Sequence, residues 1–189
     1  ELRDFCSGRI PFLISAFDID DAKELNLHGL REIKIPSHEV YNTELHEYCA
    51  NNFDKCYVSL GAGTEDETLR ASSAYNSGSC EWVAMHCISS YPCPVENANL
   101  PRLKFLKEIA IDIGLSDHTQ SLTVPAFAVS MGATVVEKHF TTDNDLPGRD
   151  NKFALNPKSF SAMVEHINHA ALAGINHGNS FLENETDTM

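Results

Sequence analysis

Short apolar segments alternate with amphipathic segments along most of the chain. The apolar segments predict strands at 11–16, 32–35, 56–60, 82–87, 111–115 and 134–138. Between them, apolar residues recur at spacings of three and four, which predicts helices at 20–27, 42–51, 65–76, 101–109 and 120–131. Strands that alternate with helices in this way are typical of βα units. The pattern therefore predicts an α/β fold with parallel strands.

Helix-start and helix-stop residues support these boundaries. Thr64 precedes an acidic first turn, as an N-cap residue does, and Gly132 follows a helical stretch. Pro125 lies within the stretch 120–131 and leaves two alternatives open. It either kinks that helix or marks its true start. Proline has no backbone N–H group, and only in the first turn of a helix is that group not needed for a hydrogen bond within the helix.

Polar side chains stand at the point where each predicted strand ends. They are Ser15, Lys34, Ser37, Ser59, His86, Ser89, Ser116, His118, Lys138 and His139. In parallel α/β folds the ligand site lies at the carboxyl ends of the strands, and in a (β/α)8 barrel every strand contributes to one mouth. For any single serine, the alternative explanation is that strand ends are exposed and favour small polar residues. The repetition in successive units favours a ligand site.

Two of these residues, His118 and His139, are a candidate metal pair. Parallel strands would bring both imidazoles to the same end of one sheet. Neutral imidazole suits manganese, iron, cobalt or zinc, and two histidines leave coordination positions open for water or substrate. Structural, hydrogen-bonded histidines are an equal alternative on spacing alone. Asp117 could orient an imidazole or face solvent.

Lysines and serines at the strand ends are suited to an anion. Burying Lys34 or Lys138 at the mouth of a sheet is unfavourable unless the ammonium group meets an anion. Together with Ser37, Ser59 and Ser116, they would form a carboxylate or phosphate pocket. The Gly61-Ala62-Gly63-Thr64 turn is either a weaker phosphate cradle or an ordinary βα turn.

Two loops carry candidate sugar contacts. Tyr91 offers a hydroxyl group and an aromatic face, both of which sugar sites use. The segment 142–152 is long and acidic, and long loops at the active face usually carry ligand contacts. Within it, Asp150 is the candidate for binding a polar substrate. The alternative for this segment is a solvated surface loop.

Composition narrows the classes of function. The 189 residues are 42% hydrophobic, which suffices for one ordinary core and favours a single domain. A net charge of −13 and a pI near 5.0 argue against a nucleic acid or an anionic membrane as partner. The chain has no apolar run of the ~18 residues needed to cross a bilayer. Its first residues resemble no targeting peptide, which predicts a cytoplasmic protein.

Cysteine usage predicts reduced thiols. The chain has six cysteines and no Cys-x-x-Cys motif, and a domain of this size does not need disulfides for stability. Cys87 lies inside an apolar segment and is interpreted as a small core residue.

Several motifs together resemble the N-acetylneuraminate (sialic acid) synthase family. The most specific block contains Ser-Asp-His-Thr at 116–119, Gly-Ala-Thr-Val-Val-Glu-Lys-His-Phe-Thr at 132–141 and Leu-Pro-Gly-x-Asp-x-Lys at 146–152. Supporting matches lie at 12–18, 33–37, 58–61 and 86–92. They run in family order from residue 11 to about residue 172.

The resemblance implies a TIM-barrel enzyme that condenses phosphoenolpyruvate with an N-acetylated aldose such as N-acetylmannosamine. The products would be a sialic (nonulosonic) acid and phosphate. It implies a divalent metal, Mn²⁺ with Mg²⁺ or Co²⁺ as alternatives, held by His118 and His139 to polarise the sugar aldehyde. The implied phosphoenolpyruvate contacts are Lys34, Ser37, Ser59 and Ser116, and the implied amino-sugar contacts are Ser89, Tyr91 and Asp150. His118, His139 and Lys34 are the expected catalytic residues.

The chain departs from the family pattern in composition and in extent. In the family, threonine is common at the positions of Ala16 and Leu60. Glycine is common at the position of Pro36, and asparagine at that of Ser89. The matches begin at the third barrel strand and include no C-terminal antifreeze-like domain. We therefore expect a partial TIM-barrel synthase domain of about six βα units at 1–173, followed by a polar, acidic tail at 174–189.

Such a partial barrel would expose two sheet edges. We expect either a complementing barrel segment or a homodimer to close it. The alternative is a catalytically inactive remnant that binds metal or a sugar phosphate. A different barrel enzyme acting on a phosphorylated sugar is favoured only if the two histidines do not share a metal.

Overall fold

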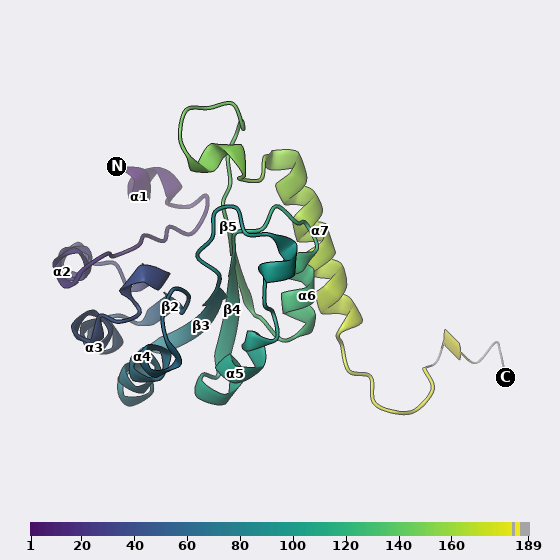
Figure 1. Ribbon diagram of the computed structural model, residues 1–189, viewed down its shortest axis with the longest axis horizontal. Coiled ribbons are helices and arrows are strands. Elements are labelled where there is room, and N and C mark those ends of the chain that lie inside the picture. Colours follow the sequence, from purple (N-terminus) through teal and green to yellow (C-terminus); the bar gives the residue numbers. More distant parts are fainter. Residues whose placement is uncertain (183, 186–189) are drawn as a thin grey trace.

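The centre of the fold is a parallel five-stranded sheet in the order β1-β2-β3-β4-β5 (Figure 1). The computed structural model describes residues 1–182, 184 and 185. The strands are β1 Glu32–Ile35, β2 Lys55–Ser59, β3 Glu81–Cys87, β4 Asp112–Asp117 and β5 Val135–Lys138. Each strand pairs in parallel with the next one along the chain. This confirms the predicted α/β class and parallel sheet, and the unreversed strand order is that of a barrel wall.

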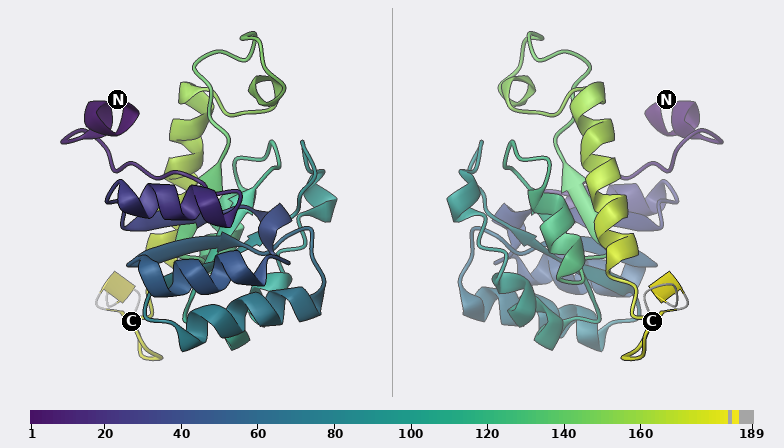
Figure 2. Two further views of the ribbon diagram at one scale, coloured as in Figure 1. Left: turned by 90° about the vertical axis from the view of Figure 1, so that its left-hand side faces the viewer. Right: turned by 90° about the vertical axis from the view of Figure 1, so that its right-hand side faces the viewer.

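Single α-helices connect successive strands and follow one another around the outside of the curved sheet, and further helices precede and follow the sheet in the chain (Figures 1 and 2). They are α1 Leu2–Cys6, α2 Ile19–Leu27, α3 Thr43–Asn52, α4 Glu65–Ser77, α5 Arg102–Ile109, α6 Val124–Ser130 and α7 Pro157–Ala173. The main core lies between the sheet and these helices, where Ile33 and Val58 of the strands and Leu45 and Leu103 of the helices are fully buried. Among the described residues, no helix combines the length and the apolarity needed to cross a bilayer.

Helix caps explain where three of the helices begin. Thr64 and Glu67 form a reciprocal capping box at the start of α4, as the sequence indicated. Pro125 lies in the first turn of α6, so the proline marks a helix start and does not kink the helix. The sequence pattern did not predict α7, although Asn156 caps it by accepting a hydrogen bond of 3.0 Å from the Ser159 amide.

The first predicted strand, 11–16, is reduced to one bridge. The amide of Lys34 donates to Ile14 O and the amide of Ala16 donates to Lys34 O, both at 3.0 Å, which makes a parallel bridge between Ser15 and β1. The prediction of a full strand here was wrong. This segment lies at the edge of the sheet, and within the described residues no strand pairs with its other side. Without that second neighbour, Leu13 and Ile14 remain partly exposed.

The ends of the chain extend from the sheet-and-helix body (Figure 1). Helix α7 ends at Ala173, and residues 174–182 contain no helix or strand. The rest of the predicted tail includes residues 183 and 186–189, which lie outside the described residues.

Candidate active site at the carboxyl ends of the strands

A cavity of about 470 Å³ opens at the carboxyl ends of the strands. Eight of the nine predicted site residues line it, namely Lys34, Ser37, Ser59, Tyr91, Ser116, His118, His139 and Asp150. The ninth, Ser89, is exposed and lies outside the lining, with its Oγ 3.8 Å from Cys87 Sγ. The structure therefore brings together side chains from segments more than 100 residues apart in the sequence.

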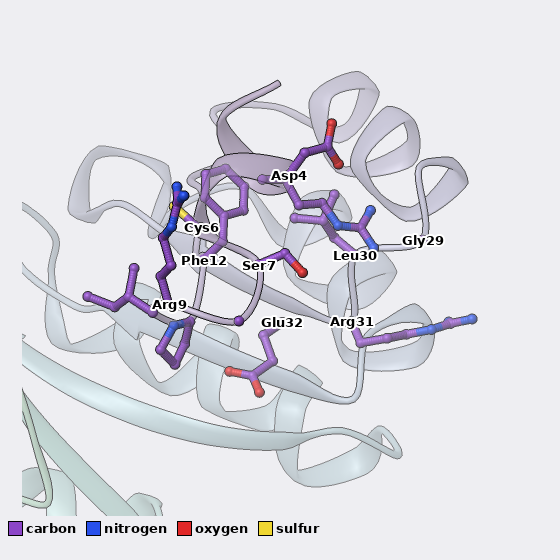
Figure 3. Close-up of a pocket in the computed structure, with 13 residues that line it drawn as sticks. Asp4, Cys6, Ser7, Arg9, Phe12, Gly29, Leu30, Arg31 and Glu32 are labelled. Carbon is purple, nitrogen blue, oxygen red and sulfur yellow. The ribbon is translucent and has the colours of Figure 1, made fainter.

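A larger hollow of about 850 Å³ lies at the opposite, amino ends of the strands (Figure 3). It is lined by the N-terminal segment and by Glu32, the first residue of β1. Two of its three arginines are hydrogen-bonded to backbone carbonyl groups. Arg3 donates to His28 O at 2.6 Å, Arg9 donates to Phe5 O at 2.9 Å, and Arg31 extends away from the hollow. Ligand sites of parallel sheets lie at the carboxyl ends, so the smaller cavity is the candidate site.

Lys34 forms the cationic centre of the cavity floor. Its Nζ donates hydrogen bonds to Ser59 Oγ at 2.8 Å and to Ile35 O at 3.0 Å, and it lies 3.6 Å from Glu137 Oε2. The side chain is only 6% exposed. Burial lowers the pKa of this ammonium group, and the nearby Glu137 carboxylate partly offsets the effect. The lysine is therefore held in a fixed position by β1, β2 and β5.

Buried serines surround this lysine. Ser37 Oγ accepts a hydrogen bond of 3.1 Å from the Gly61 amide, and Ser116 faces Glu137 across the β4–β5 register. A side chain at Gly61 would place a Cβ 2.6 Å from Cys87 O and 2.9 Å from Ser37 Oγ, so only glycine fits there. The Gly61 amide is thus already used by Ser37. The structure favours an ordinary βα turn over a phosphate cradle at this position.

The two predicted metal histidines lie side by side. Their ring centroids are 5.3 Å apart, and the Tyr91 ring lies 4.1 Å from that of His118. His118 Nδ1 lies 2.8 Å from Ile88 O. Because a carbonyl oxygen only accepts, Nδ1 carries the proton and Nε2 keeps its lone pair. Asp150 Oδ2 lies 3.7 Å from His139 Nδ1.

This donor set fits a metal ion with open coordination positions. Two imidazoles can supply nitrogen ligands, and the bond from His118 to a backbone carbonyl fixes its tautomer in the manner typical of metal ligands. Within the described part of the chain, no cluster of three or more His, Cys, Asp or Glu side chains is arranged to hold a metal. Further ligands would therefore be water or substrate oxygen atoms.

Burial and neighbouring groups shift the pKa values of the two imidazoles in opposite directions. Burial opposes the charged form of His118, but its hydrogen bonds to Cys87 and to the Ile88 carbonyl outweigh burial and raise the pKa. Burial lowers the pKa of His139, and the neighbouring His118 lowers it further. The surroundings therefore favour the protonated form of His118 and disfavour that of His139.

Lys138 and Asp117 form a buried ion pair. Lys138 Nζ lies 2.5 Å from Asp117 Oδ2, contacts Thr119 O, and the two side chains are 3% and 2% exposed. Successive residues of a strand point to opposite faces, so Glu137 and His139 share one face and Lys138 lies on the other, but Lys138 and Asp117 still line the cavity as a pair. Lys138 therefore lines the cavity as predicted, but its ammonium group is already engaged by Asp117 and the Thr119 carbonyl. Asp117 is buried and paired with Lys138 rather than facing solvent.

Sequence reasoning missed several of the residues that line the cavity. Cys87 is buried as predicted, but its Sγ lies 3.8 Å from His118 Nδ1 and thus belongs to the site rather than to a plain core. Glu137 and Arg149 also line the cavity. The two-residue spacing of Glu137 and His139 on one strand was a signal that could have identified the glutamate.

The loop after β5 carries Asp150 over the cavity and is held by its own side chains. Asn144 Nδ2 donates to Asn151 O at 2.8 Å and to Ala154 O at 2.9 Å, and Thr141 Oγ1 lies 2.8 Å from Asn151 Oδ1. Gly148 has φ +134, a conformation that side-chain-bearing residues rarely adopt. The segment is therefore an ordered loop with a required glycine turn.

A barrel-wall sheet with outer helices and a polar cavity at the carboxyl ends of its strands defines a TIM-barrel-type α/β protein. The model of the NeuB family matches residues 1–178, and the chain belongs to that family. The resemblance to sialic acid synthases is thereby confirmed.

The relatives of the chain include proteins named as legionaminic acid and N-acetylneuraminate-9-phosphate synthases. The chain is 35% identical over 167 residues to the N,N'-diacetyllegionaminic acid synthase of Legionella pneumophila, covering 85% of this chain and 47% of that protein. It is 29% identical over 169 residues to the N-acetylneuraminate-9-phosphate synthase of Drosophila melanogaster, covering 88% and 45%. The chain thus spans about half the length of these curated relatives.

A solved structure in this group has the same fold. The N-acetylneuraminic acid synthetase of Leptospira borgpetersenii, crystallised with citrate, superimposes with a TM-score of 0.87 at 28% identity. The match covers 95% of this chain and 63% of that one. The five parallel strands therefore form part of a TIM barrel, which confirms the predicted partial barrel, with five strands and one bridge in place of six strands.

Proposed function

We propose that this chain supplies the substrate-binding wall of a nonulosonic acid synthase. The reaction condenses phosphoenolpyruvate with an N-acetylated aldose, N-acetylmannosamine or a close analogue, and consumes water. A carbon–carbon bond forms between the phosphoenolpyruvate methylene carbon and the aldehyde carbon, and phosphate leaves. The observation that carries the proposal is the convergence of Lys34 and Ser59 with His118 and His139 in one cavity.

Phosphoenolpyruvate binds at the Lys34 end of the cavity. The buried ammonium group and the hydroxyl groups of Ser37, Ser59 and Ser116 are matched to its carboxylate and phosphate oxygens. Ser59 accepts one Lys34 proton in a hydrogen bond and so fixes the direction in which the remaining N–H groups point. Glu137, 3.6 Å from Nζ, favours the charged form of the lysine.

The amino sugar binds at the histidine end. His118 and His139 would hold a divalent metal, Mn²⁺ with Mg²⁺ or Co²⁺ as alternatives, which would supply Lewis-acid polarisation of the sugar carbonyl. Tyr91, beside His118, offers an aromatic face and a hydroxyl group to the sugar, and Ser89 extends this rim. Asp150, near His139, accepts hydrogen bonds from sugar hydroxyl groups.

The partner that completes the site is a complementing barrel segment or a second copy of the chain. Supporting this, the 12–15 segment has no strand on its outer side within the described residues, and Phe140 and Leu155 beyond β5 make only an isolated bridge. The same open edges favour a second candidate function. In it, the chain is an inactive remnant that binds metal or a sugar phosphate.

One assay separates these candidates. The chain is incubated with phosphoenolpyruvate, N-acetylmannosamine and Mn²⁺ while phosphate release is followed, with a full-length NeuB-family relative as positive control. Phosphoenolpyruvate binding is measured in parallel by calorimetry. Phosphate release supports the synthase. Binding without release supports the remnant, and the absence of both would overturn the proposed site.

A further inference from the structure

His86 is a buried strand-end residue that takes no part in the cavity already described. It lies on β3 beside Cys87 and is 1% exposed, and because successive residues of a strand alternate, its ring lies on the opposite face of the sheet from the Cys87 thiol. Its Nε2 lies 2.7 Å from Ala98 O, and because a carbonyl oxygen only accepts, Nε2 carries the proton. Burial lowers the pKa of the ring, so the ring is neutral and Nδ1 keeps its lone pair.

The Nδ1 atom of His86 is left without a partner. It is buried, and no described residue forms a hydrogen bond with it. Buried acceptors are nearly always satisfied by protein or by ordered water, because an unsatisfied one costs about 1–3 kcal/mol. Nδ1 therefore marks a position at which the fold needs a hydrogen-bond donor that the described residues do not supply.

A small hollow adjoins the His86 ring. About 10 Å³ of it is open to the centre of a water-sized sphere, which is close to the space that one water molecule needs. The loop after β3 forms part of its wall, and the end of β4 with the turn after it forms the rest. The lining residues are His86, Ile88, Cys93, Ala98 and 115–119. A sugar or a phosphate group is too large for this space, so a ligand here has the size of a water molecule.

Asp117 lines the same hollow and is a second acceptor. The β3–β4 register pairs His86 with Leu115, so Asp117, two residues further along β4, lies on the same face of the sheet as His86. Its carboxylate accepts three hydrogen bonds, from the Thr119 amide, from Thr119 Oγ1 and from Lys138 Nζ. A carboxylate offers about four lone-pair positions, so one remains. Nδ1 and the carboxylate cannot bond to each other because both only accept, but a water molecule has two donors and can bridge them.

The turn that contains Asp117 also carries one of the predicted metal ligands. His118 stands between Asp117 and Thr119 in the turn after β4. Lys138 of β5 holds this turn from one neighbouring strand, through the Asp117 carboxylate and the Thr119 carbonyl. A water bridge from His86 would tie the same turn to β3, the other neighbouring strand. Held from both sides, the turn would fix the direction in which the His118 ring points.

We propose that one water molecule, bound in this hollow, bridges His86 Nδ1 to the Asp117 carboxylate and makes His86 a positioning residue for His118. The water donates one hydrogen bond to each acceptor. His86 itself touches neither a substrate nor a metal. The positioning role rests on the proposed function, because it concerns the metal ligand of the same site, whereas the water site is a property of the chain alone.

Crystal structures of the metal-free full chain test the water site. We expect an ordered water within hydrogen-bond distance of both His86 Nδ1 and an Asp117 oxygen atom in the wild type. In His86→Gln the amide nitrogen takes the place of Nε2 and still donates to Ala98 O, but no acceptor remains at the position of Nδ1, so the water should be lost. In His86→Asn the amide oxygen takes the place of Nδ1, so the water should be kept. A wild-type hollow without water, or a water that contacts only one of the two residues, would overturn the proposal.

Mn²⁺ affinity, measured by electron paramagnetic resonance of the free ion, tests the positioning role. His86→Gln should weaken binding about tenfold, at the lower end of what groups behind a metal ligand contribute. His86→Asn should recover most of the affinity, although it loses the bond to Ala98. The matched control is His46→Gln, the same substitution of a fully buried histidine on α3, outside the cavity lining, and it should bind as the wild type does. A merely structural role would not separate the asparagine from the glutamine variant.

Each other outcome is decisive. Equal weakening of Mn²⁺ binding in His86→Gln and His86→Asn, or in His86→Gln and His46→Gln, would overturn the positioning role. If circular dichroism shows both His86 variants to be unfolded, the wild-type crystal structure alone decides whether the water bridge exists. Failure of the wild type to bind Mn²⁺ would overturn the metal site of the proposed function, and the presence or absence of the bridging water would still decide the water site.

Discussion

Lys34 Nζ donates a hydrogen bond of 2.8 Å to Ser59 Oγ and so joins the carboxyl ends of β1 and β2 at the cavity floor. The two residues are 25 positions apart in the sequence, and both are at least 95% buried. In the free protein the Lys34 charge is balanced by Glu137, 3.6 Å away. An anionic substrate would add a second counter-charge to this buried ammonium group.

Lys34→Met is expected to abolish most of the affinity for phosphoenolpyruvate. Loss of a buried charged contact is worth about 1.5–3 kcal/mol, so the dissociation constant should rise about 10- to 100-fold. Calorimetric titration measures it. Lys55→Met is the matched control, because Lys55 lies at the opposite end of β2, 3.8 Å from Glu81. Equal weakening in both variants would contradict a specific role for Lys34.

His118→Ala and His139→Ala are expected to lose Mn²⁺ binding and to keep the fold. Each removes one of two nitrogen ligands from a site that has no third protein ligand within the described residues. Electron paramagnetic resonance of free Mn²⁺ measures binding, and circular dichroism monitors folding. His28→Ala, at an exposed helix end, is the control. Unfolding of both site variants would instead indicate that the histidines are structural.

Gly148→Ala is expected to weaken sugar binding without affecting phosphoenolpyruvate. A Cβ at this φ of +134 is strained by about 1–3 kcal/mol and would lie 2.9 Å from Asn151 Nδ2. The loop would shift and take Asp150 with it. Calorimetry with each substrate separates the two effects. Gly178→Ala is the control, because Gly178 also has a positive φ but a Cβ added there would meet no atom within 4 Å.

The alternation of apolar and amphipathic segments was enough to locate the five described strands and to predict that they are parallel, but it did not predict their order. Parallel βα repeats bring strand ends to one edge, so residues such as Ser59 and Ser116 could be grouped before any contact was known. Side-chain direction was harder to predict. Lys138 follows an apolar run as Lys34 does, yet it points to the other face because the strand alternates.

Long-range partners explain the remaining differences. The segment 11–16 has the composition of a strand, but a strand also needs neighbours, and the sequence of one segment does not supply them. Helix α7 was missed although Asn156 and Pro157 mark its start. Cys87 looked like a core residue because its neighbours are apolar, and only the register with Ser116 places it beside His118.

The buried Asp117–Lys138 pair is expected to be structural. Asp117→Asn leaves the Lys138 ammonium group buried without a counter-charge, which should destabilise the fold by about 3–5 kcal/mol. Asp117→Asn combined with Lys138→Met removes both charges and should recover much of that loss. Urea denaturation measures the three free energies of unfolding. A double variant as unstable as the single one would contradict this interpretation.

His46 should make the stability of the protein fall in mild acid. The ring projects from helix α3 and is fully buried. Its Nδ1 lies 3.1 Å from Tyr75 Oη, and its Nε2 lies 3.2 Å from Val40 O. Burial lowers the pKa of His46 from 6.5 to about 4. Between these values the unfolded chain binds a proton that the folded protein does not, so the free energy of unfolding decreases as the pH falls through that window.

The expected loss is about 3 kcal/mol between pH 6.5 and pH 4, from the linkage between pKa and stability. Urea denaturation across this range measures it. His46→Gln removes the titrating group and should flatten the profile by that amount, even if the variant is less stable at pH 7. His28→Ala, at an exposed helix end, is the control variant. Parallel profiles for the wild type and His46→Gln would show that the acid sensitivity arises elsewhere, since the contribution of every other histidine is common to both proteins.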